Sequence, residues 1–319
     1  MADTVATRRP APTFLDVPYR PPGALVGGEI VVLGAGHCTP YPATDDVAYD
    51  LATASDTAPE AIRRAALQSS SDIDHWDFDL DGPLLADGAA TLVDGGDLPT
   101  VPGDGAGNRA LIEAATRAAV AAGAVPVLIG GDDSVPIPFH RGLAAAGPFA
   151  ILQIDAHIDW RDTLGGEPDG YSSTMRRASE LPGVRAIVQV GARGVGSARR
   201  QEVEAALAWG ARLVTAEALR RDGAEAVLAL LPEALPVVIA VDCDAFDPSV
   251  VPAVNAPTPG GPLFHEIAGL LRLVAARRRV VGLSIVELVP ARDPDGISAT
   301  VAARLVLNVV GTIARRRGA

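Results

Sequence analysis

A histidine and two aspartates alternate at the end of an apolar run near the middle of the sequence. Asp155, His157 and Asp159 follow the run 149–154. In a β-strand, side chains at positions i, i+2 and i+4 point to the same face, so these three would converge on one point if the strand conformation continued. Carboxylates and an imidazole around one point are typical ligands of a divalent metal ion.

Three more apolar runs end in acidic residues. In open α/β sheets, ligands bind in the crevice outside the carboxyl ends of the strands. We therefore expect four parallel strands to deliver acidic side chains to one rim. The acids of the other three runs are Asp132 and Asp133 after 126–129, Asp242 and Asp244 after 237–241, and Glu287 after 280–286.

At these residues the sequence resembles the ureohydrolase family, the arginases, agmatinases and their relatives, which cleave guanidinium compounds with water at a two-manganese centre. The motifs GGDDS, DAHID, DCDAFDPS, TPGG and SIVELVP occur in the order of that family, and DPDGISA follows at 293–299. The resemblance covers roughly residues 59–300. It implies a divergent, agmatinase-like hydrolase that releases urea and an amine.

The resemblance also implies roles for individual residues. Two manganese ions, with nickel as the alternative, would be held by six side chains, with Asp155 and Asp242 bridging. Catalytic roles fall to Glu287, Asp159 and Tyr171, and Glu287 would anchor the planar cation through charge-assisted hydrogen bonds. We expect Trp160 or Tyr171 to face the tail of the substrate. The implied ligands are Asp133, Asp155, Asp159 and Asp242 for the first ion, and Asp155, His157, Asp242 and Asp244 for the second.

Two positions depart from the family pattern. Most members have a histidine ligand where this sequence has Asp133, and related enzymes carry a proton-transferring histidine where Tyr171 aligns. A phenol with a pKa near 10 is a poor base at neutral pH. The substrate therefore stays open between an agmatine-like compound, a guanidino acid, an alkylguanidine, a biguanide and a formimidoyl compound. A weakly active subunit that supports a catalytic paralogue is the alternative from another class.

Composition limits the possible partners. The chain has 319 residues, 48% of them hydrophobic, and a net charge of −12. That charge argues against nucleic-acid or anionic-membrane partners, which favour a basic face, and it favours a small cationic substrate. Cys38 and Cys243 are the only cysteines and lie far apart, which suits a reducing compartment. With no secretory signal and no uninterrupted apolar run long enough to span a bilayer, we expect a cytoplasmic protein.

Apolar runs alternate with helical patterns through most of the chain. This pattern predicts a three-layer αβα fold around a mostly parallel, doubly wound sheet. We expect an extended N-terminal arm over 1–28 and one catalytic domain over 29–319. Because the arm has few evident apolar partners in its own chain, we also expect a homo-oligomer, a trimer or hexamer. The predicted strands are 29–33, 126–129, 149–154, 186–191, 211–214, 237–242 and 280–286, with a short edge strand near 90–93. The predicted helices are 59–67, 108–122 (capped by Asn108), 199–209, 217–230, 263–277 and 298–315.

Overall fold

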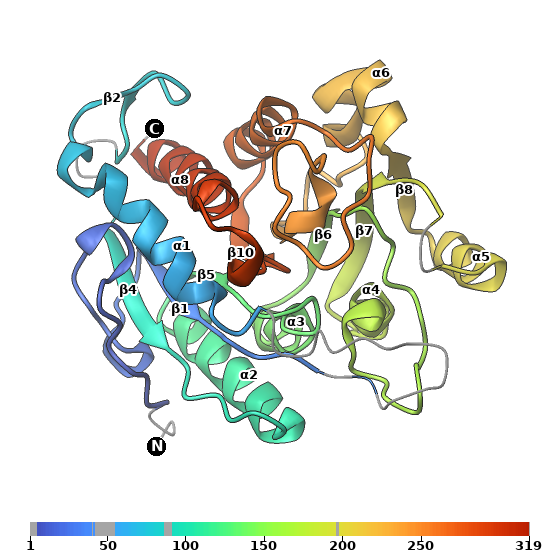
Figure 1. Ribbon diagram of the computed structural model, residues 1–319, viewed down its shortest axis with the longest axis horizontal. Coiled ribbons are helices and arrows are strands. Elements are labelled where there is room, and N and C mark those ends of the chain that lie inside the picture. Colours follow the sequence, from blue (N-terminus) through green and yellow to red (C-terminus); the bar gives the residue numbers. More distant parts are fainter. Residues whose placement is uncertain (1–4, 40, 42–54, 86–90, 196–197, 319) are drawn as a thin grey trace.

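Eight parallel strands form one sheet at the centre of the molecule (Figure 1). The computed structural model of the chain describes residues 5–39, 41, 55–85, 91–195 and 198–318. The strands in the middle of the sheet are apolar runs that are buried on both faces, as in other parallel sheets, whereas the two edge strands include exposed residues. From edge to edge the strands are β4 (Thr91–Asp97), β1 (Glu29–Gly34), β5 (Val125–Ile129), β10 (Val280–Val286), β9 (Val237–Asp242), β6 (Phe149–Ile154), β7 (Val184–Ala192) and β8 (Arg212–Thr215).

Helices cover both faces of the sheet and complete three layers (Figure 1). One layer packs α1, α6, α7 and α8 over one apolar core, and the other places α2, α3 and α4 over a second core. The predicted αβα architecture is confirmed. The helices are α1 (Ala58–Ala66), α2 (Gly105–Ala121), α3 (Pro136–Ala144), α4 (Thr174–Ser179), α5 (Arg200–Trp209), α6 (Ala216–Leu228), α7 (Phe264–Arg277) and α8 (Ile297–Gly318).

The four acid-bearing strands are neighbours in the middle of the sheet, in the order β5, β10, β9 and β6. Parallel pairing brings their carboxyl ends to the same edge. The topology therefore gathers acids that are far apart in sequence at one rim.

The start of α2 differs from the prediction. The N-cap lies four residues earlier, at Asp104, whose Oδ1 accepts a hydrogen bond from Gly107 N at 2.9 Å. Asn108 is buried instead, and its amide nitrogen lies 3.0 Å from His37 Nδ1 and donates to Val101 O at 2.8 Å. A capping aspartate thus starts the helix, and the asparagine holds a loop.

The N-terminal segment packs on its own chain. Phe14 is fully buried, and its backbone N donates to Asp94 Oδ2 of β4 at 2.7 Å. The same carboxylate pairs with the buried Arg63 of α1 at 2.8 Å. Phe14, Leu15 and Val17 also belong to the larger apolar core. The expectation that this arm has few apolar partners in its own chain was therefore wrong, and the arm gives no argument for oligomerisation.

The helix α8 is long and apolar enough to cross a membrane by length and composition alone. Within the fold, 72% of its apolar window is buried, where it packs against α1 and α7. The apolar character of α8 is therefore accounted for by its place in the core.

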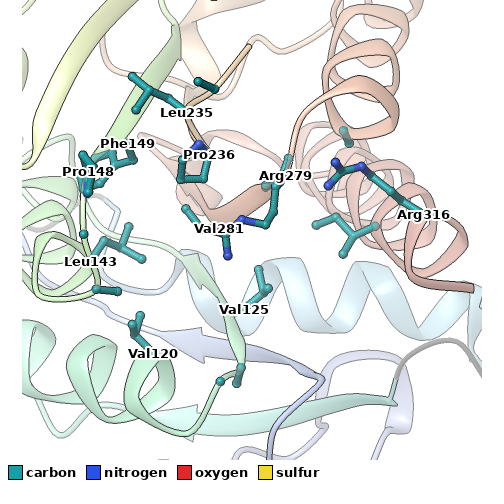
Figure 2. Close-up of a pocket in the computed structure, with 18 residues that line it drawn as sticks. Val120, Val125, Leu143, Pro148, Phe149, Leu235, Pro236, Arg279, Val281 and Arg316 are labelled. Carbon is teal, nitrogen blue, oxygen red and sulfur yellow. The ribbon is translucent and has the colours of Figure 1, made fainter. Parts of the chain in front are cut away.

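A cavity of about 600 Å³ lies at the amino ends of the central strands, at the opposite edge of the sheet from the acids (Figure 2). Apolar side chains such as Leu143, Phe149 and Leu235 line it, together with Arg279 and Arg316. The carboxyl ends of α2, α3, α7 and α8 also lie near it. Arginines near helix carboxyl ends complement the negative end of the helix dipole, so their presence there has a structural explanation.

Candidate metal centre and active site

The loops after the central strands hold the predicted ligands. β6 ends at Ile154, so Asp155 to Asp159 lie in a loop and do not continue the strand. Asp159 has a positive φ of 42°, a conformation that is uncommon outside glycine. The convergence expected from strand alternation is therefore produced by loop geometry.

Glycine is required in the loop after β5. Gly131 has φ of 74°, and a Cβ atom there would lie 2.4 Å from the carbonyl oxygen of His37. The Gly131 carbonyl accepts the backbone N–H of Glu287 at 2.9 Å. This close approach brings the loop that carries Asp133 against the end of β10.

Two groups of metal-ligating side chains meet at the rim, and they share Asp155. One group is Asp133, Asp155 and Asp159, and the other is Asp155, His157 and Asp244. Within each group, one ligand atom per residue lies within 4.8 Å of the others. A carboxylate common to both groups is suited to bridge two divalent ions.

Asp242, the sixth predicted ligand, is buried beside these groups. Its Oδ1 accepts the backbone N–H of Asp244 at 2.7 Å. Its pKa is raised well above the usual range, first by burial and then by the charges of Asp244 and Asp155. Asp242 therefore belongs to the same electrostatic cluster.

The buried acids fit a cation site. Burial raises the pKa of Asp133 and Asp155 well above normal, and neighbouring carboxylates raise it further. Among these neighbours, the charge of Asp159 has the largest effect on both. Asp133 Oδ2 is buried and has no hydrogen-bond partner among the described residues. Crowded carboxylates with a free oxygen gain most from a bound cation, and an oxygen-rich donor set favours manganese or magnesium.

His157 is the only imidazole in the two groups. Its Nδ1 lies 3.1 Å from Asp244 Oδ2 and 3.4 Å from Asp155 Oδ1. Burial favours the neutral ring, but the hydrogen bond and charge of Asp244 outweigh burial and raise the pKa of His157 to about 9. The nitrogen that faces these acids occupies the position of a ligand atom.

Glu287 closes the site at the end of β10. Its Oε1 accepts the backbone N–H of Asp133 at 2.8 Å, and its Oε2 lies 3.5 Å from Asn255 Nδ2. Burial, followed by the charge of Asp132, raises its pKa to about 8. A cationic ligand beside Glu287 would favour the ionised carboxylate.

Aromatic residues lie near the acids, but not all where expected. Tyr171 packs on Tyr41 with ring centroids 4.6 Å apart, and the Tyr41 hydroxyl lies 2.6 Å from Ser172 Oγ. Trp160 was expected to face the substrate, yet it is 3% exposed and packs in the core against Trp209, with centroids 6.0 Å apart. Its indole belongs to the apolar cluster that α2, α3 and α4 share, and its contact with the substrate stays a prediction.

Sequence reasoning missed several residues of the site. Arg193 donates from its guanidinium to the carbonyls of Asp244 and Thr258, at 2.9 and 2.7 Å, and so ties two rim loops together. Gln153 donates to Asp155 and Asp159 from inside the sheet, and Gln189 donates to Gln153 and to the Ile158 carbonyl. A polar residue within an otherwise apolar strand was the signal for these two glutamines.

The comparisons agree with this geometry. A model of the arginase family matches residues 30–311. The chain belongs to the arginase family. It is 30% identical to proclavaminate amidinohydrolase from Streptomyces clavuligerus over 95% of this chain and 93% of that protein. It is also 30% identical to N(1)-aminopropylagmatine ureohydrolase from Thermococcus kodakarensis, over 81% of this chain and 84% of that protein.

Solved structures show the same fold. The proclavaminate amidinohydrolase structure has a TM-score of 0.77 at 25% identity, and covers 98% of this chain and 99% of its own. The structure of formimidoylglutamase from Bacillus subtilis has a TM-score of 0.80 at 22% identity, and the match covers 98% of this chain and 96% of that chain. Arginase-family members are metal-dependent hydrolases of guanidino and amidino compounds, and the chain is an enzyme of this class.

Proposed function

We propose that this arginase-family enzyme is agmatinase-like and cleaves a small guanidino compound with water to urea and an amine, with two manganese ions per chain. The observation that carries the proposal is the pair of ligand groups sharing Asp155, closed by Glu287, which accepts a hydrogen bond from the backbone of Asp133. The oxygen-rich donor set supports manganese, and nickel is the alternative ion.

The residues have separable tasks in this reaction. The six ligands Asp133, Asp155, His157, Asp159, Asp242 and Asp244 would hold the ions, which supply an activated water and polarise the substrate when bound. The Glu287 carboxylate orients the planar guanidinium through paired hydrogen bonds. Asp159 is the proposed acceptor of the proton of the attacking water. Tyr171, whose phenol is protonated at neutral pH, is the proposed donor to the departing amine.

The arginines near the site argue against a carboxylate on the substrate tail. The sequence contains no lysine, and all 27 of its basic side chains are arginines. Arg161 and Arg176 are the arginines that would leave room for an anionic tail, but among the described residues Arg161 pairs with Glu202 at 3.7 Å. Arg176 and Arg177 pair with Asp162 and Glu180, and Arg193 donates to backbone carbonyls. Residues 42–54, which follow Tyr41 in sequence, contain no arginine. We therefore propose a tail that is uncharged or cationic.

One experiment tests both the reaction and the tail. Manganese-loaded and nickel-loaded protein is assayed for urea release from two guanidines of equal length, one ending in an amine and one in a carboxylate. We expect kcat/KM for the amine-ended compound to be at least about tenfold higher, a difference of roughly 1.4 kcal/mol. Equal or reversed preference would contradict the tail assignment. Urea release only after a paralogous chain is added would support the supporting-subunit alternative.

Glu287→Gln tests the anchoring residue. The change removes the charge and nearly keeps the shape, so kcat/KM should fall by about 10²-fold or more while the metal content stays at the wild-type value. Asn255→Asp, a change of charge at the neighbouring position, serves as the comparison for nonspecific electrostatic effects. Loss of metal in parallel with activity would show that Glu287 has a structural role instead.

We also propose a cytoplasmic enzyme that assembles with copies of itself. Both cysteines are free, as in a reducing compartment. Arginase-family proteins are commonly oligomeric, and homo-oligomers usually have closed point-group symmetry, so a trimer or hexamer is expected.

A further inference from the structure

Gln153 is a polar side chain in the interior of the central strand β6. It is 1% exposed, and its amide nitrogen donates to Asp155 Oδ2 at 2.6 Å and to Asp159 Oδ2 at 2.8 Å. Ionised carboxylate oxygens only accept hydrogen bonds, so the amide must present its nitrogen to the acids. One side chain thus uses both of its N–H groups on two members of the same ligand group.

Gln189 on the next strand, β7, holds Gln153 in this orientation. The two glutamines are paired in register across β6 and β7. Gln189 Nε2 donates to Gln153 Oε1 at 2.5 Å and to Ile158 O at 2.7 Å. The second bond fixes the peptide just before Asp159, whose positive φ of 42° needs support from its surroundings. The pair therefore connects the sheet both to the carboxylates and to the strained turn that carries one of them.

The ligand group that Gln153 contacts is the more negative of the two. Asp133, Asp155 and Asp159 offer three carboxylates, whereas the other group includes the imidazole of His157. Carboxylates held this close repel one another in a buried site. Two N–H donors from one amide offset part of that repulsion and fix one oxygen of each acid.

We propose that Gln153 and Gln189 are positioning residues that preorganise the Asp133, Asp155 and Asp159 half of the centre for its ion. This inference rests on the proposed assignment of these acids as metal ligands. Gln153 acts through Asp155 and Asp159, and Gln189 acts through Gln153 and the Ile158 carbonyl. Partners of this kind, which orient metal ligands, typically change metal affinity by about 10–100-fold.

Manganese titration of metal-free Gln153→Leu tests the proposal, because leucine fills a similar volume without donors. In Gln153→Leu, the site that contains Asp133 should bind manganese about tenfold or more weakly than in the wild type. This site is identified as the one that Asp133→Ala abolishes. The affinity of the other site should change by less than about threefold. Ser284→Ala is the matched control, because Ser284 lies in the central strand β10 and its buried hydroxyl has no partner among the described residues.

The charge argument adds a second readout. In an Asp133→His background the group has one negative charge fewer, so the affinity lost on Gln153→Leu should be smaller than in the wild type, as a double-mutant cycle measures. Thermal unfolding of the metal-free proteins checks that they fold. If Gln153→Leu does not fold, the same titration is made on Gln189→Leu. Unchanged affinities, or an equal loss at both sites, would overturn the positioning role alone. A wild-type protein that binds no manganese would overturn the proposed function as well.

Discussion

In the proposed centre, Asp133 would join Asp155 and Asp159, so that half of the centre would offer only oxygen ligands. Most family members have a histidine at this position, and imidazole favours nickel and zinc more than a carboxylate does. The site in this chain should therefore discriminate less strongly for those metals. Burial, followed by the charge of Asp159, raises the pKa of Asp133 well above its usual range.

Substitution of Asp133 should change the number of bound ions. Asp133→Ala should retain only one manganese ion per chain after dialysis against a chelator. Asp133→His should retain both ions, and should bind them more firmly than the wild type does. The reason is that the alanine removes a ligand, whereas the histidine keeps a ligand and lowers the charge of the group. Elemental analysis of the dialysed proteins measures both. Two ions and full activity in Asp133→Ala would show that the side chain is no ligand.

The sequence identified most acids of the site but could not place every neighbour. Asp155, His157 and Asp244 come together as their motifs predicted, because the strand ends are fixed by the apolar runs before them. Trp160 lies beyond the end of β6, where strand alternation no longer applies, so its burial against Trp209 was not predictable. The contact between Gln153 and Asp159 likewise depends on a loop that returns to the sheet.

At the scale of elements, the strands were predictable and two helices were not. α3 contains Pro136, Pro138 and Gly142, residues that normally argue against a helix. Pro136 stands at the first helical position, where its missing N–H costs nothing, and Gly142 approaches α2 so closely that a Cβ atom would lie 2.7 Å from Thr116 Cβ. α4 has six residues, too few to show a helical period. Packing against the sheet and neighbouring helices, and not the local sequence pattern, therefore determines that these two segments are helical.

α3 also makes stability depend on pH. His140 is fully buried, neither ring nitrogen has a hydrogen-bond partner among the described residues, and burial lowers its pKa to about 3. The unfolded chain would bind a proton with a pKa of about 6.5. Between these values the unfolded state binds more protons, so stability is lost as the pH falls below about 6.5.

His140→Phe should remove this loss. Relative to wild type, the free energy of unfolding of the metal-free variant should improve by roughly 1.4 kcal/mol for each pH unit below about 6.5. Urea unfolding of both proteins at several pH values measures the difference. For the control His265→Phe, at an exposed position, the difference in the free energy of unfolding from wild type should not change with pH. If the difference for His140→Phe also does not change with pH, the assignment of a buried neutral His140 is contradicted.

At the scale of the whole molecule, one aromatic side chain stands out from the surface. Phe78 is 91% exposed and lies between the short strands β2 (Trp76–Asp77) and β3 (Gly82–Pro83). Arg304 holds the hairpin through two hydrogen bonds of 2.6 Å to Asp77. A cavity of about 380 Å³ lies beside Phe78 on the same surface. A projection and a hollow on one surface suit contact with a second copy of the chain.

Phe78→Ser should therefore weaken self-association. We expect the wild type to be a closed oligomer at micromolar concentration and the variant to dissociate at concentrations at least about tenfold higher than the wild type does, since a buried aromatic anchor contributes about 2 kcal/mol or more. Light scattering over a dilution series measures both. Val195→Ser, at another exposed apolar position, is the control. A monomeric wild type, or equal behaviour of the two variants, would contradict this contact.

The place of β10 bears on how the chain acquires its metal during synthesis. It is synthesised after all the other strands of this sheet, yet it lies between β5 and β9 and separates the sheet into two halves. Until it inserts, Asp133 belongs to one half, and Asp155 and Asp242 belong to the other. A nascent chain that lacks β10 would therefore have no complete centre and would expose two unpaired strand edges, which favour aggregation. The ion assigned to Asp133, Asp155 and Asp159 could then bind only after β10 has been synthesised and inserted, and a chain that ends before residue 286 would lack the complete two-metal centre.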